Sequence, residues 1–519
     1  DAMMDAIIEH LSKIKDLRVK PRTSVEQFHG TKKTPQQIGK ELEVSYILEG
    51  SFQRYGDSAM LNVRLIRANN EDLLWTNNYD RNWKNIFSVQ REVAQTIARE
   101  LKVVITPEEQ QLIEKASTKN LTAYDFYMRG REEHMNYMNI GIIMYFQENL
   151  EALNKAGYYY LKALEYDSTF ALAYTGLALI YNEKHAFSSG LNTSENYLDS
   201  TIILADKALT FDDNIAEAYD ARAMYYTATG HFKEALAEYD KSLKLNPNDW
   251  LAFIGKGNIY FWEDMLQGLI NLHKAANLLR GSAQFPSILR SIADLYSQAG
   301  FHEKSKEYIS EAFTLDNDSV RYFDAIGKID FYTLNYKEAL KYLEKGYKID
   351  SDNILLLGSL GSTNLFAGNY ELSLKYYKKY LEKLEDRGQV SINETHRIAY
   401  AFFRNGFRKE ADYYFNKQIE LSENDIKNGR MYSQAKYTYY DLAAVYAFKG
   451  NKDMALKNLR IVNEKTEFPS WGLYYIKNDP LIDSIRKEPE FQKIARDLEA
   501  KYNLGHEKVR KWLEEQGKL

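Results

Sequence analysis

The chain has 519 residues, no cysteine and a formal net charge of −5 at pH 7. The length suffices for several hydrophobic cores, and the absence of cysteine excludes disulfides, catalytic thiols and thiolate metal sites. A duplex-binding protein usually carries a basic surplus, so the near balance of charge predicts no direct nucleic-acid binding. No apolar run approaches the roughly 18 residues of a transmembrane helix, which predicts no membrane insertion by this chain.

Residues 1–105 show mixed helix and strand patterns, which predict a small α+β domain with one sheet. Apolar residues recur at helical spacing in the first segment and alternate with polar ones in the later strands. The expected elements, in chain order, are a helix over 4–14, a strand over 17–19, a helix beginning at Thr34-Pro35, strands over 44–54, 61–65 and 73–79 with a hairpin turn at 55–58, and a long helix over 86–104.

Short segments of this region carry a family resemblance. They are Ile14–Val19 with Arg22-Thr23-Ser24, Ile38–Leu42, Tyr46–Ser51, Leu74-Trp75 with Tyr79-Asp80-Arg81, and Ile86–Gln90. Together they resemble the TolB-like amino-terminal domain, which often precedes tetratricopeptide arrays in bacterial regulators. Members usually begin with an apolar strand ahead of the first helix, whereas this chain opens at Asp1 inside that region. We therefore expect an incomplete domain and a longer parent protein.

Residues 106–119 are expected to form a helical connector rather than a loose linker. Thr106 is suited to the N-cap position, Pro107 to the first helical position, and Glu108 and Glu109 to the first turn. No run rich in glycine and serine is present, and such runs are typical of flexible linkers.

The segment 216–249 reads as two helices separated by a turn at Gly230 and ended by Asn246-Pro247. Small and aromatic residues alternate on the helix faces, as at Ala235 and Tyr239. A 34-residue helical hairpin cannot bury its apolar faces alone, so it predicts similar neighbours.

About nine copies of this pattern follow one another over residues 120–467. Their period and composition resemble the tetratricopeptide repeat. The resemblance implies a mainly α protein, a right-handed α-solenoid of about nine helix pairs. Residues 131–155 and 185–198 lengthen the first two units and are candidates for contacts with the α+β domain or a partner. Residues 468–519 leave the pattern, and we interpret them as carboxyl-terminal capping helices.

The sequence contains no recognisable pattern of catalytic or metal-binding residues. His134 has no partner histidine at metal-binding spacing. Asp316-Asn317-Asp318 begins like a calcium loop, but Arg321 and Gly327 stand where glycine and an acidic ligand are required. We therefore predict no catalytic residue, no metal and no cofactor, and no enzymatic activity.

The remaining candidate for a functional site is an interaction surface. The tetratricopeptide resemblance implies that the first helix of each unit lines a concave groove, and Glu217 and Asp220 occupy such inward positions. Arginine and aromatic side chains anchor many interfaces, and they are frequent here. A protein or peptide segment is the expected partner, while water or the α+β domain facing these residues stays open as an alternative. The predicted groove residues are Asn258, Trp262, Arg290, Asp294, Arg321, Asp324, Lys328, Tyr332, His396, Tyr400, Arg404 and Tyr440.

The pairing of the two regions resembles the sensor part of larger bacterial regulators. The segments 124–127, 478–480 and 508–515 look most like the AraC-type helix-turn-helix regulators of Bacteroidetes. The resemblance implies a regulatory, protein-binding module of a signalling or transcription-regulatory protein, in which a membrane span often separates effector from sensor. A stand-alone assembly scaffold and the regulatory region of an adenylate cyclase-type enzyme stay open. So do the oligomeric state and the compartment, which is cytoplasmic or periplasmic, the latter favoured for a membrane-spanning parent.

Overall fold

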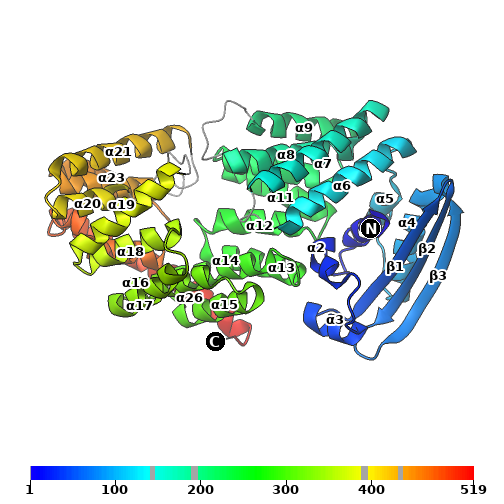
Figure 1. The fold of residues 1–519 in the computed structure, drawn as a ribbon, viewed down its shortest axis with the longest axis horizontal. Helices are drawn as coiled ribbons and strands as arrows, with labels where there is room; N and C mark the ends of the chain where they lie inside the picture. Colours follow the sequence, from blue (N-terminus) through cyan, green and yellow to red (C-terminus); the bar gives the residue numbers. More distant parts are fainter. Residues whose placement is uncertain (1, 141–145, 189–196, 387–394, 430–435, 519) are drawn as a thin grey trace.

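The computed structural model describes residues 2–140, 146–188, 197–386, 395–429 and 436–518 (Figure 1). A small α+β domain comes first and lies at one end of the molecule. Its order of elements agrees with the predicted one except at the first strand. The elements are α1 (Ala2–Ser12), α2 (Arg22–Val25), the 3-10 turn η1 (Glu26–Phe28), α3 (Pro35–Leu42), β1 (Tyr46–Tyr55), β2 (Ser58–Arg67), β3 (Asp72–Asn82), the 3-10 turn η2 (Trp83–Asn85) and α4 (Ile86–Glu100).

The three strands form one antiparallel sheet in the order β1-β2-β3. The predicted hairpin turn closes with Tyr55 opposite Ser58, and Gly56 adopts the left-handed φ of 58° that the turn requires. One face of β2 carries Leu61, Val63 and Leu65, all buried in a core shared with α1 and α4. The alternation read from the sequence thus separates the covered face of the sheet from the solvated one.

The predicted strand over 17–19 is wrong. This segment has no strand partner, because its backbone is bound by a side chain from the repeats. The amide of Val19 donates to Oδ1 of Asn248 at 3.0 Å, and Nδ2 of Asn248 donates to the carbonyls of Leu17 at 2.9 Å and Ser12 at 3.0 Å. Asn248 is separated from this segment by more than 200 residues, so a local pattern of apolar residues cannot reveal the contact.

The connector contains the predicted helix, α5 (Pro107–Glu114), with Thr106 and Glu109 in a reciprocal capping box. Helical hairpins follow, in which each helix packs against the next. The nine hairpins of the described residues are α6 (Leu121–Ile140) with α7 (Phe146–Tyr166), α8 (Ala171–Ser188) with α9 (Tyr197–Phe211), α10 (Ala216–Ala228) with α11 (Phe232–Leu245), α12 (Trp250–Tyr260) with α13 (Met265–Leu279), α14 (Phe285–Gln298) with α15 (His302–Asp316), α16 (Ser319–Tyr332) with α17 (Tyr336–Ile349), α18 (Ile354–Phe366) with α19 (Tyr370–Asp386), α20 (Thr395–Arg404) with α21 (Arg408–Lys427), and α23 (Tyr437–Phe448) with α24 (Lys452–Val462).

The small and aromatic positions of the repeat serve close helix packing. The ring of Tyr239, on α11, lies against Gly255 on α12, where an added Cβ would be 2.1 Å from the ring carbon Cζ. Gly230 ends the first helix of the same hairpin with φ at 77°. These contacts confirm the α-solenoid and the register in which the sequence was read.

The lengthened units are described in part. Within them, residues 141–145 and 189–196 lie outside the described residues. Glu132, in the first extension, binds Arg22 of the α+β domain through two oxygens at 3.0 and 3.2 Å. The expected contact with that domain is therefore present at Glu132.

Ala235→Phe is expected to lower the free energy of unfolding by about 1–3 kcal/mol, because overpacking a filled seam forces neighbouring helices apart. Ala235 is fully buried in the hairpin core with Ala223, Tyr239 and Ala252. Chemical denaturation followed by circular dichroism measures the change. Ala237→Phe, on the exposed side of the same helix, is the matched control and should leave stability nearly unchanged. Equal stability of the two variants would contradict the register.

The carboxyl-terminal segment forms α25 (Ser470–Asn478), the 3-10 turn η3 (Pro480–Ile482) and α26 (Pro489–Glu515). Asp479 caps η3, which begins at Pro480, and Pro489 is the first residue of α26. The segment does not merely cover the last hairpin: α26 runs back to the middle of the array, and the C-terminus lies near α15 (Figure 1). There Val509 and Leu513 are buried against α13 and α14.

Candidate functional site

The inner surface of the array is lined by the first helices of the hairpins, and two parts of the same chain cover its ends. At the beginning of the array, α1 of the α+β domain contacts α6, and a cleft remains between α1, α6 and α10. Further along the array, α25 packs against α14 and α16 and against inner residues of later hairpins. The ring of Tyr475 lies within 6.4 Å of Phe331, Phe366 and Tyr440, measured between ring centroids.

Five predicted groove residues lie where the carboxyl-terminal segment or the hairpins themselves enclose them, and a sixth, Arg404, is exposed but contacts one of the five. Tyr332 packs its ring on Tyr474 and Tyr475, and the hydroxyl of Tyr440 donates to Asp479 at 3.1 Å. His396 is fully buried, and burial holds the pKa of its imidazole well below the usual value. Of the remaining three, Trp262 packs on Tyr437 of the distant helix α23, Tyr400 is buried, and Arg404 donates to the Tyr400 hydroxyl at 3.0 Å.

The other six lie along α12, α14 and α16. Lys328 pairs with Asp324 at 2.7 Å, and Arg290 pairs with Asp316 at 2.7 Å. The Asp294 side chain touches solvent but is recessed among protein atoms, which raises its pKa to about 6 although Lys328 and Arg290 act against the shift. Asn258 is exposed, and Arg321 pairs with Asp318 at 3.4 Å. The structure thus brings Arg290, Asp294, Asp324 and Lys328 into one electrostatic neighbourhood.

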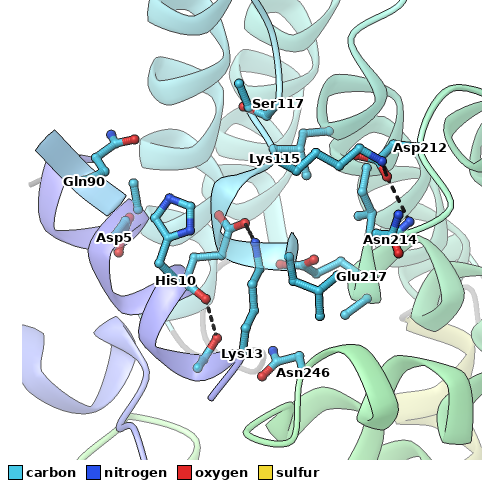
Figure 2. A pocket seen from close by; sticks show the side chains of 18 of the residues that line it. Asp5, His10, Lys13, Gln90, Lys115, Ser117, Asp212, Asn214, Glu217 and Asn246 are labelled. Carbon is cyan, nitrogen blue, oxygen red and sulfur yellow. Dashed lines mark hydrogen bonds and ion pairs between the residues drawn. The ribbon is translucent and has the colours of Figure 1, made fainter. Parts of the chain in front are cut away.

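The cleft between the α+β domain and the first three hairpins is lined by charged side chains from distant parts of the sequence (Figure 2). Asp5, His10 and Lys13 come from α1, Lys115 from the connector, and Glu217 from α10. A second cavity continues past Arg131 and Glu217 towards Trp250. Because polar and charged side chains from separate elements converge on it, the cleft is a candidate binding site for a small molecule.

Sequence reasoning found this cleft only in part. Glu217 and Asp220 stand at inward repeat positions, but Asp5, His10 and Arg131 carry no motif. Asp5 and Arg131 come together only because α1 docks on α6. The predicted inward repeat positions were the one available signal.

A buried pair of carboxyl groups lies below the cleft. Asp220, on α10, is fully buried and lies beside Asp249 and Ser242. Asp249 caps α12 and accepts a hydrogen bond from Ser242 at 2.5 Å. Burial, followed by the Asp249 charge, holds the pKa of Asp220 well above its usual value of 3.8. The native state therefore binds a proton at Asp220 more tightly than the unfolded state does.

Asp220→Asn is expected to stabilise the protein at pH 7. A raised native pKa contributes stability below the unfolded pKa of 3.8, and that contribution is lost as pH rises through the native pKa. Asparagine carries a neutral amide and is not subject to this loss. We therefore expect Asp220→Asn to raise the free energy of unfolding by about 1 kcal/mol or more at pH 7, and the increase to disappear near pH 4. Denaturation curves from pH 4 to 8 measure it, with exposed Asp213→Asn as control. A pH-independent or negative difference would contradict the assignment.

Two further searches concern only the described residues. Within them, no group of three or more histidine, aspartate or glutamate side chains is arranged to hold a metal ion. None of the helices described has both the length and the apolar character of a transmembrane span.

Two family models match the chain. The model described as HilA/YgeH-like transcriptional regulator, second domain, matches residues 1–96, and the tetratricopeptide repeat model matches residues 216–249. The second match covers the same 34 residues from which the repeat pattern was read. The first connects the α+β domain with transcriptional regulators, as the sequence resemblance implied, although through a family other than the TolB-like one.

A curated relative and two solved structures are similar to parts of the chain. The relative, described as putative adenylate cyclase 3 of Rhizobium meliloti (strain 1021), is 28% identical over 180 residues, which are 35% of this chain and 29% of the relative. The chain thus matches less than a third of that protein. A tetratricopeptide repeat protein from Parabacteroides merdae ATCC 43184 is 14% identical over 56% of this chain and 99% of its own, with a TM-score of 0.38. YrrB, described as a tetratricopeptide protein with an unusual peptide-binding site, is 20% identical over 35% of this chain and 93% of its own, with a TM-score of 0.26.

Tetratricopeptide repeats are protein–protein interaction modules, and their fold is typically a non-catalytic scaffold. The chain contains a tetratricopeptide repeat at residues 216–249 within an array of helical hairpins, and its N-terminal domain is similar to the second domain of HilA/YgeH-like transcriptional regulators.

Proposed function

We propose that the chain is a non-catalytic, protein-binding regulatory module of a larger bacterial signalling or transcription-regulatory protein. The observation that carries the proposal is the regulator-type domain packed directly on the repeat array. Arg22 and Asn248 hold this domain on the inner side of the first hairpins through hydrogen bonds to distant segments. A module joined in this way is suited to transmit binding on the array to the α+β domain.

We assign partner binding to the part of the inner surface that carries Asn258, Asp294 and Lys328, on α12, α14 and α16. The helix α25 packs on α14 at Ser297 and on α16 at Tyr332, at the carboxyl-terminal ends of these two helices. Asn258, Asp294 and Lys328 are exposed there, and Arg290 is half-buried. Charges of both signs lie close together, which suits an extended polypeptide because its backbone and side chains offer both donors and acceptors. The partner is a protein or peptide segment.

Selection of peptides from a displayed random library tests this assignment. Peptides that bind the unaltered chain should lose about tenfold or more in affinity for Arg290→Glu with Lys328→Glu, because two cations are replaced by acids. Lys341→Glu with Lys337→Glu, on the second helix α17, is the matched control. Tyr400 is unsuitable for this test because it is buried, so its substitution would report on stability. Equal affinity of both double variants would contradict the assignment.

The regulatory region of an adenylate cyclase-type enzyme is the second candidate function. It is favoured by the relative described as an adenylate cyclase, of which the chain matches only a part. The coding sequence on either side of this chain distinguishes the candidates: a helix-turn-helix domain in the same frame supports the first and a cyclase domain the second. An effector in neither position would favour a stand-alone assembly scaffold.

A further inference from the structure

The cleft between α1, α6 and α10 is lined by charged side chains, most of which form ion pairs or hydrogen bonds with other residues. On the α1 side, Asp5 pairs with Arg22 at 2.9 Å, and Glu9 pairs with Lys13 at 3.3 Å. On the array side, Lys115 pairs with Asp212 at 2.5 Å (Figure 2). Within each of these pairs, the positive charge neutralises the negative one.

Other cationic groups at the rim are also engaged or uncharged. Arg91 donates to the carbonyl of Glu114 at 2.7 Å. His10 is neutral at pH 7, because burial lowers its pKa to about 4, and its Nδ1 has no hydrogen-bond partner among the described residues. The imidazole therefore adds no positive charge to the cleft.

Asp249, which lines the second cavity, accepts hydrogen bonds from Ser242 and from amides of α12. Among the charged side chains that line the cleft, one cation and one anion are left without a hydrogen bond or ion pair to the described residues. Arg131, on α6, and Glu217, on α10, line both halves of the cleft. Neither has a hydrogen bond or ion pair from its side chain to any described residue, and each acts on the other electrostatically across the space between them. Buried or half-buried charges are normally paired, because losing water without a partner is costly.

The surroundings distinguish the two ends. Burial and the nearby Glu9 carboxylate raise the pKa of Glu217, as expected for a carboxylate that has no paired cation. Around Arg131 stand the hydroxyls of Tyr127 and Tyr160, and that of Tyr160 is buried with no partner among the described residues. Glu217 thus lies among carboxylates, whereas Arg131, which also acts electrostatically on Asp5 and Glu9, has Tyr127 beside it in the lining of the cleft.

We propose that this cleft binds a small zwitterion of the amino-acid class, with its carboxylate on Arg131 and its ammonium between Glu217 and Glu9. Such a molecule supplies both missing charges at once, whereas a simple anion or cation leaves one of them unpaired. Because the ligand touches α1 and two helices of the array, its binding strengthens their contact. This inference concerns a small-molecule site and does not depend on which protein partner the inner surface takes.

Ligand analogues test the proposal on the unaltered chain. The probes are the L-amino acids and a set of dipeptides, each added at millimolar concentration while the melting temperature is recorded, with calorimetry on those that raise it. We expect at least one probe to bind, and its carboxamide and N-acetyl derivatives to bind about tenfold more weakly or worse, since each loses one charge-assisted contact. The dipeptides show whether the site takes a free amino acid or a peptide.

Variants test whether Arg131 binds the carboxylate of the ligand and Glu217 its ammonium group. Arg131→Gln should weaken the parent ligand by about tenfold or more but affect its carboxamide little, and Glu217→Gln should do the same with the N-acetyl derivative. Arg129→Gln, an exposed arginine on the same helix that pairs with Asp125, is the matched control and should bind normally. The proposal is overturned if no zwitterion binds, or if both derivatives bind as tightly as the parent. Equal effects of Arg129→Gln and Arg131→Gln would also overturn it.

Discussion

Replacing Asp479 with alanine is expected to lower the free energy of unfolding by about 3–5 kcal/mol, the usual effect of removing one partner from a buried ion pair. Asp479 is 1% exposed and stands 3.7 Å from the Arg397 guanidinium, which is itself buried. Its carboxylate also accepts from the Tyr440 hydroxyl at 3.1 Å and caps η3 through the Leu481 amide at 2.9 Å. Arg397 in turn lies 3.8 Å from the centroid of the Tyr475 ring, so we expect the destabilisation to extend to α25.

Chemical denaturation with intrinsic fluorescence measures this change. Asp483→Ala is the matched control, because Asp483 lies four residues away, is mostly exposed and pairs with Arg486 only at the surface. Surface pairs contribute at most about 1 kcal/mol, so the control should remain close to the unaltered protein. If Asp479→Ala were as stable as the control, the carboxyl-terminal segment would not be fixed in the array as described.

Replacing Arg22 with alanine should destabilise the joint between the α+β domain and the array by about 3–5 kcal/mol. The Arg22 guanidinium is buried and binds Asp5 on α1, Glu26 in η1 and Glu132 on α6, with distances from 2.9 to 3.2 Å. Removal leaves the buried Asp5 carboxylate without this cation. It also breaks the contact between the two parts of the chain.

Hydrogen exchange followed by mass spectrometry checks the second prediction. Amides of α1 should exchange faster in Arg22→Ala, while those of α16 and α18 should remain protected, because the later hairpins do not touch Arg22. Arg18→Ala is the control, since Arg18 is exposed in the same segment. Uniform acceleration over the whole chain, or none at all, would show that Arg22 does not join the two parts.

The two predictions concern residues with different sequence signals. Asp479-Pro480 is recognisable as a helix start, so its capping role follows from local chemistry. Arg22 was noted only as part of a family resemblance, and its three partners lie on different elements. Local capping can be predicted, whereas an ion-pair network across a domain contact cannot.

The sequence by itself determined the repeated hairpins, because the 34-residue period of small, aromatic and turn residues is set by how neighbouring helices pack. Gly255 must be small because the Tyr239 ring occupies the adjacent space. It also determined the β1–β2 hairpin and the caps at Thr34 and Thr106, which depend on residues three positions apart at most. Only the tertiary structure decided what lies inside the array. The docking of α1 and α25 depends on contacts between residues hundreds of positions apart, such as Leu17 with Asn248, for which no local pattern exists. Those contacts cover the ends of the predicted groove and create the cleft at Arg131 and Glu217.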